Sequence, residues 1–367
     1  MDRTLKTVLD VTECTHSRGG VGRWVRGLSK GLFEANSGHI SIDVPETHPG
    51  HRCTVREARS LPEPLWMNLP VLRRFFLSRG MLESSRAERI QKAFGIPDIL
   101  HLSGVQPFGS GRQKVVTFFD DTPWTSPDSH NAETLFYAGR LKSLIESGAA
   151  VLAISNWAAS SAQNLFGIPP ERTGNAGGAA EDLFTPGEPD ADTLFRLNLK
   201  KGEYFLHVGS FVPRKNIPFL VRCFEEAETG AKKLVLAGAE AWGDDVSGHS
   251  QNVLYLRSAS DAELLALYRG ALALLLPSSS EGLGLPVMEA FACGTPVVAS
   301  DGGALPETVG SNGLLLPVKN REAWVKAIED ISEGRTLSML RRMSEGAPRP
   351  TWLDTGRRTM DFYRGLM

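Results

Sequence analysis

The segment that most constrains the fold spans residues 271–294 and consists of an apolar run, a glycine-rich loop and a helical pattern. The apolar run, 271–276, is typical of a strand buried on both faces of a parallel sheet. Pro286 suits the first turn of the helix because its missing N–H would have no partner there anyway, and Gly294 suits a C-cap. The segment therefore predicts a strand that leads through a loop into a helix.

Two carboxylates flank this loop, Glu281 within it and Glu289 one turn inside the predicted helix. The backbone N–H groups at the start of such a helix can hold a phosphate or a sugar hydroxyl. We therefore predict a ligand site in which Glu281 faces a sugar and Glu289 faces a ribose. The alternative is a structural turn with two solvated glutamates.

Composition narrows the class of protein. A chain of 367 residues with 41% hydrophobic and 22% charged residues is typical of a globular protein of two domains. A net charge of −2 gives no argument for a nucleic-acid partner. The four cysteines lack metal-ligand spacing, which favours buried, reduced thiols. The first ten residues contain no stretch typical of a signal peptide, and no segment approaches the roughly 20 apolar residues of a membrane-spanning helix. We therefore expect a cytoplasmic protein.

Short apolar runs alternate with helical patterns along the chain, which predicts parallel sheets with helical crossovers. The expected strands are 7–11, 99–102, 115–119, 150–154, 204–208, 233–238, 271–276 and 295–300, and the expected helices include 21–35, 217–228 and 261–269. The polar, proline-bearing segment 185–190 predicts a linker. We expect an α/β protein with two Rossmann-like, doubly wound domains, 1–187 and 188–351, facing each other across a cleft. The last helix, 354–366, fits either domain by its pattern.

A second candidate site follows the strand 204–208. Gly209 leaves room for a ligand near the backbone, and Arg214 and Lys215 follow as adjacent cations. An arginine forks onto phosphate oxygens and a lysine acts as a compact charge, so together they can stabilise a leaving diphosphate. The alternative is a solvated basic pair on a loop.

Two loops in the first half are weaker candidates. The first carries Gly19 and Gly20 between a strand and a helix, where a diphosphate or sugar can lie against the backbone, although it is not a GxGxxG fingerprint. The second carries Asp120 and Asp121 after the strand 115–119. Two adjacent acids without a third ligand are poor evidence for a metal site. We predict that Asp120 forms a wall of the acceptor site, with metal binding as the alternative.

A basic and aromatic stretch covers residues 65–79. Between residues 51 and 92 the chain carries nine Arg or Lys residues against four Glu residues, with Trp66, Phe75 and Phe76 among them. This combination favours contact with an anionic membrane surface. An ordinary amphipathic helix over the core is the alternative.

Together these motifs resemble the retaining glycosyltransferases of the GT-B fold in glycosyltransferase family 4. The resemblance covers nearly the whole chain and is most specific at Glu281 and Glu289, which match the family's two glutamates separated by seven residues. Four other segments resemble family motifs: 19–25 the donor-side glycine loop and first helix, 153–157 the serine motif after a strand, 206–209 with 214–216 the diphosphate site, and 352–367 the helix that packs back on the N-terminal domain.

The resemblance implies roles for matching residues. Arg214 and Lys215 would hold the donor diphosphate, Glu281 would contact the donor sugar, and Glu289 would accept hydrogen bonds from the ribose. The segment 256–260 would lie against the nucleobase. The implied catalytic set is Arg214, Lys215, Glu281 and Asp120. The implied donor-binding set is Gly19, Gly20, Gly209, Ser210, Ala259, Gly282, Leu283, Gly284, Leu285 and Glu289.

Two positions depart from the family pattern. Phe119 stands where family members often have a histidine near the hydroxyls of the donor sugar, and this replacement bears on donor preference and on activity. Ala180 stands where an aspartate is common, a change that we interpret as structural.

The resemblance implies transfer of a hexose, with retention at the anomeric carbon, from a nucleoside-diphosphate sugar to a saccharide or polyprenyl-linked saccharide in surface polysaccharide assembly. GDP-mannose is the favoured donor, followed by UDP- and dTDP-sugars, with no metal or other cofactor and no nucleic-acid partner. The expected location is the cytoplasm, including the inner face of the cytoplasmic membrane. Two alternatives remain open: a sugar-nucleotide epimerase of the same fold, and a catalytically weak nucleotide-binding partner subunit, which Phe119 favours.

Overall fold

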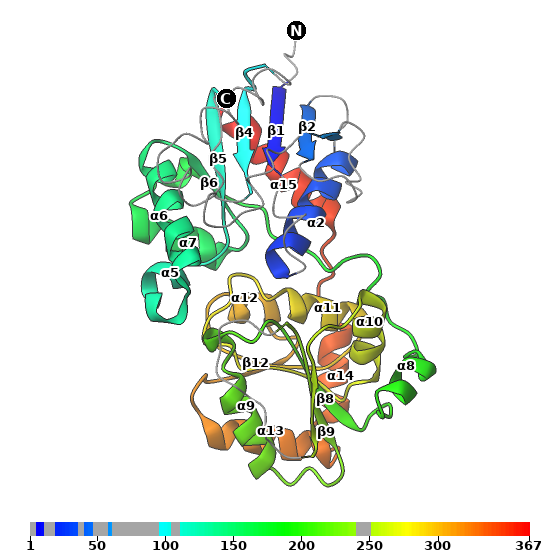
Figure 1. Cartoon of the computed structure of the whole chain (residues 1–367). Helices are drawn as coiled ribbons and strands as arrows, with labels where there is room; N and C mark the ends of the chain where they lie inside the picture. Colours follow the sequence, from blue (N-terminus) through cyan, green and yellow to red (C-terminus); the bar gives the residue numbers. More distant parts are fainter. Residues whose placement is uncertain are drawn as a thin grey trace. The chain divides into compact units, whose positions relative to one another are not determined.

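The computed structural model describes residues 5–10, 19–35, 40–46, 58–60, 95–103, 111–239 and 251–367. The chain divides into two compact units (Figure 1). Unit 1 consists of Met1–Asp121, Ala132–Gly178 and Thr351–Met367, and unit 2 consists of Thr122–Asn131 and Ala179–Pro350. The division falls at Gly178 rather than at the expected residue 187, and the short segment Thr122–Asn131 groups with unit 2.

Unit 1 contains a seven-stranded sheet in which every strand pair is parallel. Its strands are β1 (Leu5–Asp10), β2 (Ile40–Glu46), β3 (Ala58–Ser60), β4 (Ile99–Leu102), β5 (Gln113–Phe118), β6 (Ala150–Ala153) and β7 (Thr173–Asn175), in the order β3-β2-β1-β4-β5-β6-β7. Its helices are α2 (Gly20–Ala35), α6 (Ala132–Glu146), α7 (Asn156–Phe166) and α15 (Trp352–Gly365), with a 3₁₀ turn, η3 (Pro170–Arg172). All four residues of β4 and of β6 are buried, as expected of central parallel strands.

The C-terminal helix α15 packs directly on α2, although more than 300 residues separate them in the chain (Figure 1). The contact depends on two glycines: a Cβ added to Gly31 would collide with the backbone of Trp352, and a Cβ added to Gly356 would collide with the backbone of Gly31. Tyr363 of α15 also reaches the sheet, where its hydroxyl lies 2.5 Å from Nδ1 of the buried His101. Glycine therefore allows two helix backbones to approach closely at this crossing.

Unit 2 contains a six-stranded sheet, also parallel throughout. Its strands are β8 (Tyr204–Val208), β9 (Lys233–Ala237), β10 (Val253–Leu256), β11 (Leu274–Leu276), β12 (Val297–Ser300) and β13 (Leu314–Leu316), in the order β10-β9-β8-β11-β12-β13. Its helices are α5 (Thr122–Thr125), α8 (Ala191–Arg196), α9 (Ile217–Glu226), α10 (Asp261–Gly270), α11 (Leu285–Cys293), α12 (Leu305–Val309), α13 (Arg321–Ser332) and α14 (Leu337–Glu345), and two 3₁₀ turns are η2 (Pro127–Ser129) and η4 (Pro213–Lys215).

The sheet of unit 2 is buried on both faces. Leu206 of β8 belongs to a core cluster with residues of α10 and α11, whereas its neighbour Phe205 belongs to a second cluster with residues of α9 and α13. Successive side chains of a strand point to opposite faces, so β8 supplies both clusters. The strand order reverses direction between β8 and β11, which places the loops after these two strands at a switch point, where ligands bind in sheets of this kind.

The predicted α/β class with two Rossmann-like parallel-sheet domains is confirmed. Most element ends agree within a few residues; the apolar run 271–276 is a strand only over Leu274–Leu276, because Ala271 is the C-cap of α10. Ser260 caps α10 with a capping box, as predicted. Cys223 and Cys293 are buried and form no disulfide. Within the described ranges, no helix combines the length and hydropathy needed to cross a bilayer.

Candidate active site

Two loops of unit 2 meet at the carboxyl ends of β8 and β11. The backbone N–H of Ser279 donates to the carbonyl of Arg214 at 2.7 Å, and Oγ of Ser279 donates to the same carbonyl at 3.1 Å. Asn216 Nδ2 donates to the carbonyl of Pro277 at 3.4 Å. Because β8 and β11 are neighbours in the sheet, segments about 65 residues apart in sequence become one site.

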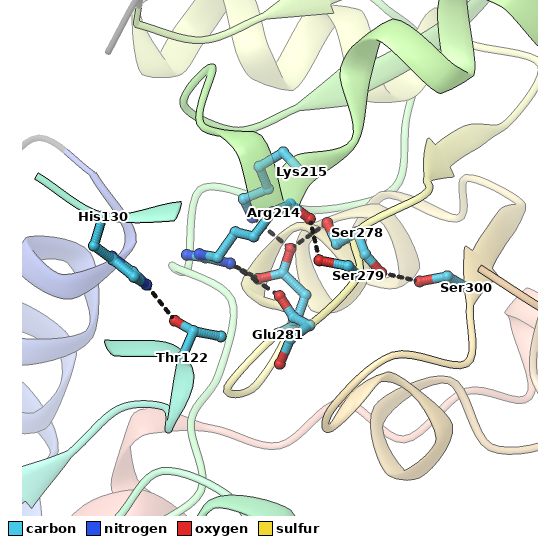
Figure 2. Close-up of polar contacts among 9 residues, drawn as sticks. Thr122, His130, Arg214, Lys215, Ser278, Ser279, Glu281 and Ser300 are labelled. Atoms are coloured by element: carbon cyan, nitrogen blue, oxygen red, sulfur yellow. Dashed lines mark hydrogen bonds and ion pairs between the residues drawn. The ribbon is translucent and has the colours of Figure 1, made fainter. Parts of the chain in front are cut away.

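The centre of this site is a cluster of one carboxylate and two cations (Figure 2). Lys215 Nζ lies 2.5 Å from Glu281 Oε1, and Arg214 Nη1 lies 3.1 Å from Glu281 Oε2. Oγ of Ser278 donates to Oε1 at 2.6 Å, and Arg214 also donates to the carbonyl of Ser280 at 3.1 Å. Arg214 and Lys215, which the sequence assigned to a diphosphate, thus form ion pairs with Glu281, which it assigned to a sugar.

Burial makes these interactions strong. The side chains of Lys215 and Glu281 are 8% and 7% exposed, and that of Arg214 is 24% exposed. Burial alone would raise the pKa of Glu281, but the charges of Lys215 and Arg214 and the hydrogen bonds from Lys215 and Ser278 outweigh it and lower this pKa to about 2. Glu281 is therefore ionised at neutral pH. Two cations around one anion leave the cluster with one net positive charge, which suits an anionic ligand.

Gly209 makes room for the lysine. Its φ is +156°, and a Cβ added there would lie 3.2 Å from Cε of Lys215. Lys215 ends the 3₁₀ turn η4 and Asn216 follows in the left-handed conformation, with a φ of 54°. The backbone after β8 therefore turns the lysine side chain back across the strand end. Ser210, between Gly209 and this turn, is half-buried.

The loop between Glu281 and α11 is held by neighbouring backbone and hydroxyl groups. The N–H of Ala304 donates to the carbonyl of Glu281 at 2.8 Å, and Oγ1 of Thr308 donates to the carbonyl of Leu283. Gly284 is the N-cap of α11 with a φ of +86°, and Leu285 begins the helix with Pro286 in its first turn, as predicted. Gly282 and Leu283 are buried. The loop that would present N–H groups to a ligand thus has a fixed conformation.

Glu289 is buried within α11, one turn inside the helix as predicted. Its Oε2 accepts a hydrogen bond of 2.7 Å from the hydroxyl of Tyr268 on α10. Ala259 precedes the cap of α10 and packs against the core cluster that contains Leu206 and Tyr268. Two helices that follow different strands therefore meet through a carboxylate and a phenol.

A second buried polar residue, His207, lies near the ion cluster. Nδ1 of His207 is 3.0 Å from the carbonyl of Leu275, and the ring is fully buried. Burial is the main cause that lowers the pKa of His207 to about 4, with the charge of Lys215 acting in the same direction. The ring is therefore neutral at pH 7, and it adds no charge near Lys215 and Glu281.

The remaining predicted site residues belong to unit 1. Gly19 and Gly20 lie at the start of α2, and Asp120 follows β5. Phe119 packs edge-on against Trp24 of α2, with ring centroids 5.5 Å apart, and Trp24 Nε1 donates to the carbonyl of Gly177 at 2.8 Å. The loop after β5 and the helix after β1 therefore lie side by side within this unit. Among the described residues, no three His, Cys, Asp or Glu side chains are grouped to hold a metal ion.

Some predictions fall elsewhere. The basic and aromatic stretch 65–79 lies outside the described residues, as do Cys14 and Cys53.

Figure 2 also draws Thr122 and His130 of unit 2, with the hydroxyl of Thr122 2.9 Å from Nε2 of His130.

Sequence reasoning missed two residues of the site, Ser278 and Tyr268. Ser278 has a weak signal, because it follows a buried strand and precedes Glu281 by three positions. Tyr268 has none, because it is one of several large residues on α10 and nothing in its spacing relates it to Glu289.

Comparison with protein families identifies the second half of the chain. Residues 191–349 match the family described as Glycosyl transferases group 1. The chain is 30% identical over 269 residues to O-antigen chain mannosyltransferase B of Escherichia coli, covering 69% of this chain and 70% of that protein. It is 32% identical over 195 residues to D-inositol 3-phosphate glycosyltransferase of Mycobacteroides abscessus, covering 50% of this chain and 44% of that protein.

Solved structures resemble the whole chain. Sucrose-phosphate synthase from Thermosynechococcus elongatus has a TM-score of 0.69 at 22% identity, covering 99% of each chain. HepE of Anabaena, solved in complex with UDP and glucose, has a TM-score of 0.68 at 16% identity, covering 97% of this chain and 98% of that one. At these identities the similarity concerns the fold.

Proposed function

This chain belongs to the group 1 glycosyltransferases and has their GT-B fold, and from that premise we propose that it is a retaining hexosyltransferase of family 4 that uses a nucleoside-diphosphate sugar. The observation that carries the proposal is the buried cluster of Lys215, Arg214 and Glu281 at the switch point of the unit 2 sheet. Its net positive charge and the adjacent start of α11 suit the diphosphate of such a donor.

The residues of the cluster have distinct roles in this proposal. Arg214 and Lys215 bind the diphosphate and stabilise the charge that grows on it as the bond between the anomeric carbon and the diphosphate oxygen breaks. Glu281 orients both cations and contacts the donor sugar, and Glu289 accepts hydrogen bonds from the ribose. The acceptor hydroxyl forms the new bond to the anomeric carbon on the face that the diphosphate leaves. Its proton passes to the departing diphosphate, which gives retention.

Mannose is the favoured sugar and GDP-mannose the favoured donor. The support is the name of a relative, an O-antigen chain mannosyltransferase that is 30% identical to this chain. We propose a saccharide or polyprenyl-linked saccharide as acceptor, in surface polysaccharide assembly at the inner face of the cytoplasmic membrane. In this reaction the two cations carry the charge that a metal ion carries in other transferases, so transfer is expected to persist in EDTA.

Replacing Lys215 tests the diphosphate site. Lys215→Ala should weaken binding of GDP or UDP at least about tenfold, because it removes a charge-assisted contact. Calorimetric titration of both nucleotides measures this, with Lys326→Ala as the control, since Lys326 is an exposed lysine of α13 whose partner is Asp330. Unchanged affinity in Lys215→Ala would contradict the assignment of the diphosphate to this site.

Turnover assays separate the proposed reaction from its alternatives. Incubation with GDP-mannose and a saccharide acceptor should give a glycoside with the anomeric configuration of the donor, detectable by NMR. An altered sugar nucleotide formed without acceptor would indicate an epimerase. Nucleotide binding without any turnover would indicate a partner subunit, which Phe119 at the family's histidine position favours.

A further inference from the structure

Tyr268 is a buried residue that the proposed reaction does not use. Its side chain is fully buried in the core cluster of unit 2, yet its hydroxyl points to an ionisable group, Glu289, rather than to the backbone. The bond is 2.7 Å long and ends on Oε2 of the carboxylate. A hydrogen bond of this length restricts the orientation of the carboxyl group that accepts it.

The tyrosine is itself held by contacts at its ring and at its carbonyl. Its ring packs edge-on against Phe184, with centroids 5.6 Å apart at 90°. Its carbonyl accepts a hydrogen bond of 2.7 Å from Oγ1 of Thr295, which follows the C-cap of α11. Tyr268 therefore joins α10 to α11 through Glu289 and to the segment that follows α11 through Thr295. A phenol held in this way favours one orientation of the carboxyl group that it contacts.

A second tyrosine of the same cluster provides the comparison. Tyr204 is also fully buried, and its hydroxyl donates to the carbonyl of Leu267 at 2.8 Å. The hydroxyl of Tyr204 therefore donates to a backbone carbonyl, as is usual for a tyrosine buried in a protein core. Of these two hydroxyls, that of Tyr268 orients a residue that the proposed function assigns to the donor.

We propose that Tyr268 is a positioning residue for nucleotide recognition: its hydroxyl holds the Glu289 carboxylate in the orientation that accepts hydrogen bonds from a ribose diol, and so makes the site selective for ribonucleoside over 2′-deoxyribonucleoside diphosphates. This inference rests on the proposed function. A carboxylate has about four acceptor positions, so a bond from Tyr268 orients it and leaves capacity for ligand hydroxyls. A site built to pair with a hydroxyl rejects the analogue that lacks it, because its own polar group then loses a partner. The substrate class is thereby narrowed to ribonucleotide sugars such as GDP- or UDP-sugars, and dTDP-sugars are disfavoured.

The test compares affinities for GDP, UDP and their 2′-deoxy analogues by calorimetry. Wild type should bind the preferred ribonucleotide about tenfold more tightly than its deoxy analogue. Tyr268→Phe should lose most of that tenfold preference by weakening the ribonucleotide and leaving the deoxy analogue within about twofold. Tyr204→Phe removes an equally buried hydroxyl and should leave the preference intact. Equal weakening of both ligands in Tyr268→Phe, as a merely structural role predicts, would overturn the proposal, and so would an unchanged preference.

A second variant keeps the test valid if Tyr268→Phe folds poorly. Glu289→Ala should by itself abolish the preference for the ribonucleotide, and adding Tyr268→Phe to it should change the preference no further, as expected of two residues that act as one unit. Retained selectivity in Glu289→Ala would overturn the proposal. If wild type binds a nucleotide without distinguishing ribose from deoxyribose, this inference fails and the proposed function stands. If wild type binds no nucleotide, the proposed function itself fails.

Discussion

At the scale of single residues, the site depends on a balance between burial and charge. Glu281 is a buried carboxylate that remains ionised because Lys215 and Arg214 contact its two oxygens and Ser278 donates to one of them. Taking charges out of water is costly, and only close pairing and hydrogen bonding offset that cost. Removing one member therefore leaves the others buried without compensation.

This balance predicts a large loss of stability in Glu281→Gln. The amide cannot neutralise Lys215, so the free energy of unfolding at pH 7 should fall by about 3 kcal/mol. Urea unfolding followed by circular dichroism measures it. Ser278→Ala, which removes one hydrogen bond and no charge, should cost about 1 kcal/mol and serves as the control. Equal losses in the two variants would contradict a cluster governed by charge.

The same carboxylate gives a pH dependence with a definite sign. The pKa of Glu281 is lowered from 4.5 to about 2 in the folded protein, so the unfolded chain binds its proton first as pH falls. Its contribution to stability is complete above about pH 4.5 and is lost as pH falls toward 2. The difference in stability between wild type and Glu281→Gln should accordingly shrink as pH falls from about 4.5 toward 2.

At the scale of elements, close helix packing is decided by residues without side chains. Helices α2 and α15 approach until the backbones of Gly31, Trp352 and Gly356 are in contact. Elsewhere, capping fixes where helices begin: Thr351 and Asp354 form a capping box that starts α15, as Ser260 and Glu263 do for α10.

The α2–α15 crossing predicts a contrast between glycines. Gly31→Ala or Gly356→Ala places a methyl group against rigid backbone and should lower the free energy of unfolding by about 2 kcal/mol, within the usual cost of overpacking. Gly139, exposed on α6, has no heavy atom within 4 Å of the position that a Cβ would take, so Gly139→Ala should stabilise the protein by about 0.5–1 kcal/mol through helix propensity. Thermal and urea unfolding of the three variants measure the contrast, and similar effects in all three would contradict the close crossing.

At the scale of the whole molecule, each unit contains a buried neutral histidine. In unit 1, burial lowers the pKa of His101 to about 3, and its ring nitrogens lie within hydrogen-bond distance of Tyr363 and Thr117. In unit 2, burial chiefly lowers the pKa of His207 to about 4. Both values lie well below the 6.5 of an exposed histidine. In both units, the free energy of unfolding should therefore begin to fall at a pH above the range in which carboxylates titrate.

The histidines predict loss of stability in mild acid. Between about pH 6.5 and 4 the unfolded chain binds protons that the folded units do not, so stability falls as pH falls through this window. At pH 5 each histidine should cost roughly 2 kcal/mol relative to pH 7.5. Urea unfolding at both pH values tests this, and His207→Gln should reduce the difference in unit 2. Equal stability at both pH values would contradict this prediction, because it would show that the buried rings are protonated in the folded protein at pH 5.

The sequence alone determined which segments form most of the strands and helices, and it predicted which of them carry chemistry. Buried strands such as Ile99–Leu102 and Tyr204–Val208 were predicted to the residue, because a run of apolar side chains between polar loops has few other stable conformations. Pro286 and Gly294 marked the ends of α11 for the same local reason. The motifs around Glu281 and Lys215 indicated a diphosphate site through residue type and spacing alone.

Only the tertiary structure decided which of these segments meet. Strand order brings the loops after β8 and β11 together and joins Lys215 to Glu281, and helix packing brings Tyr268 to Glu289. It also places α15 on α2, as the family resemblance had implied, whereas the helical pattern of the C-terminal segment by itself had fitted either domain. Periodicity reports how a residue relates to its neighbours in the chain, whereas contacts between distant residues follow from sheet topology and from shapes that no local pattern encodes.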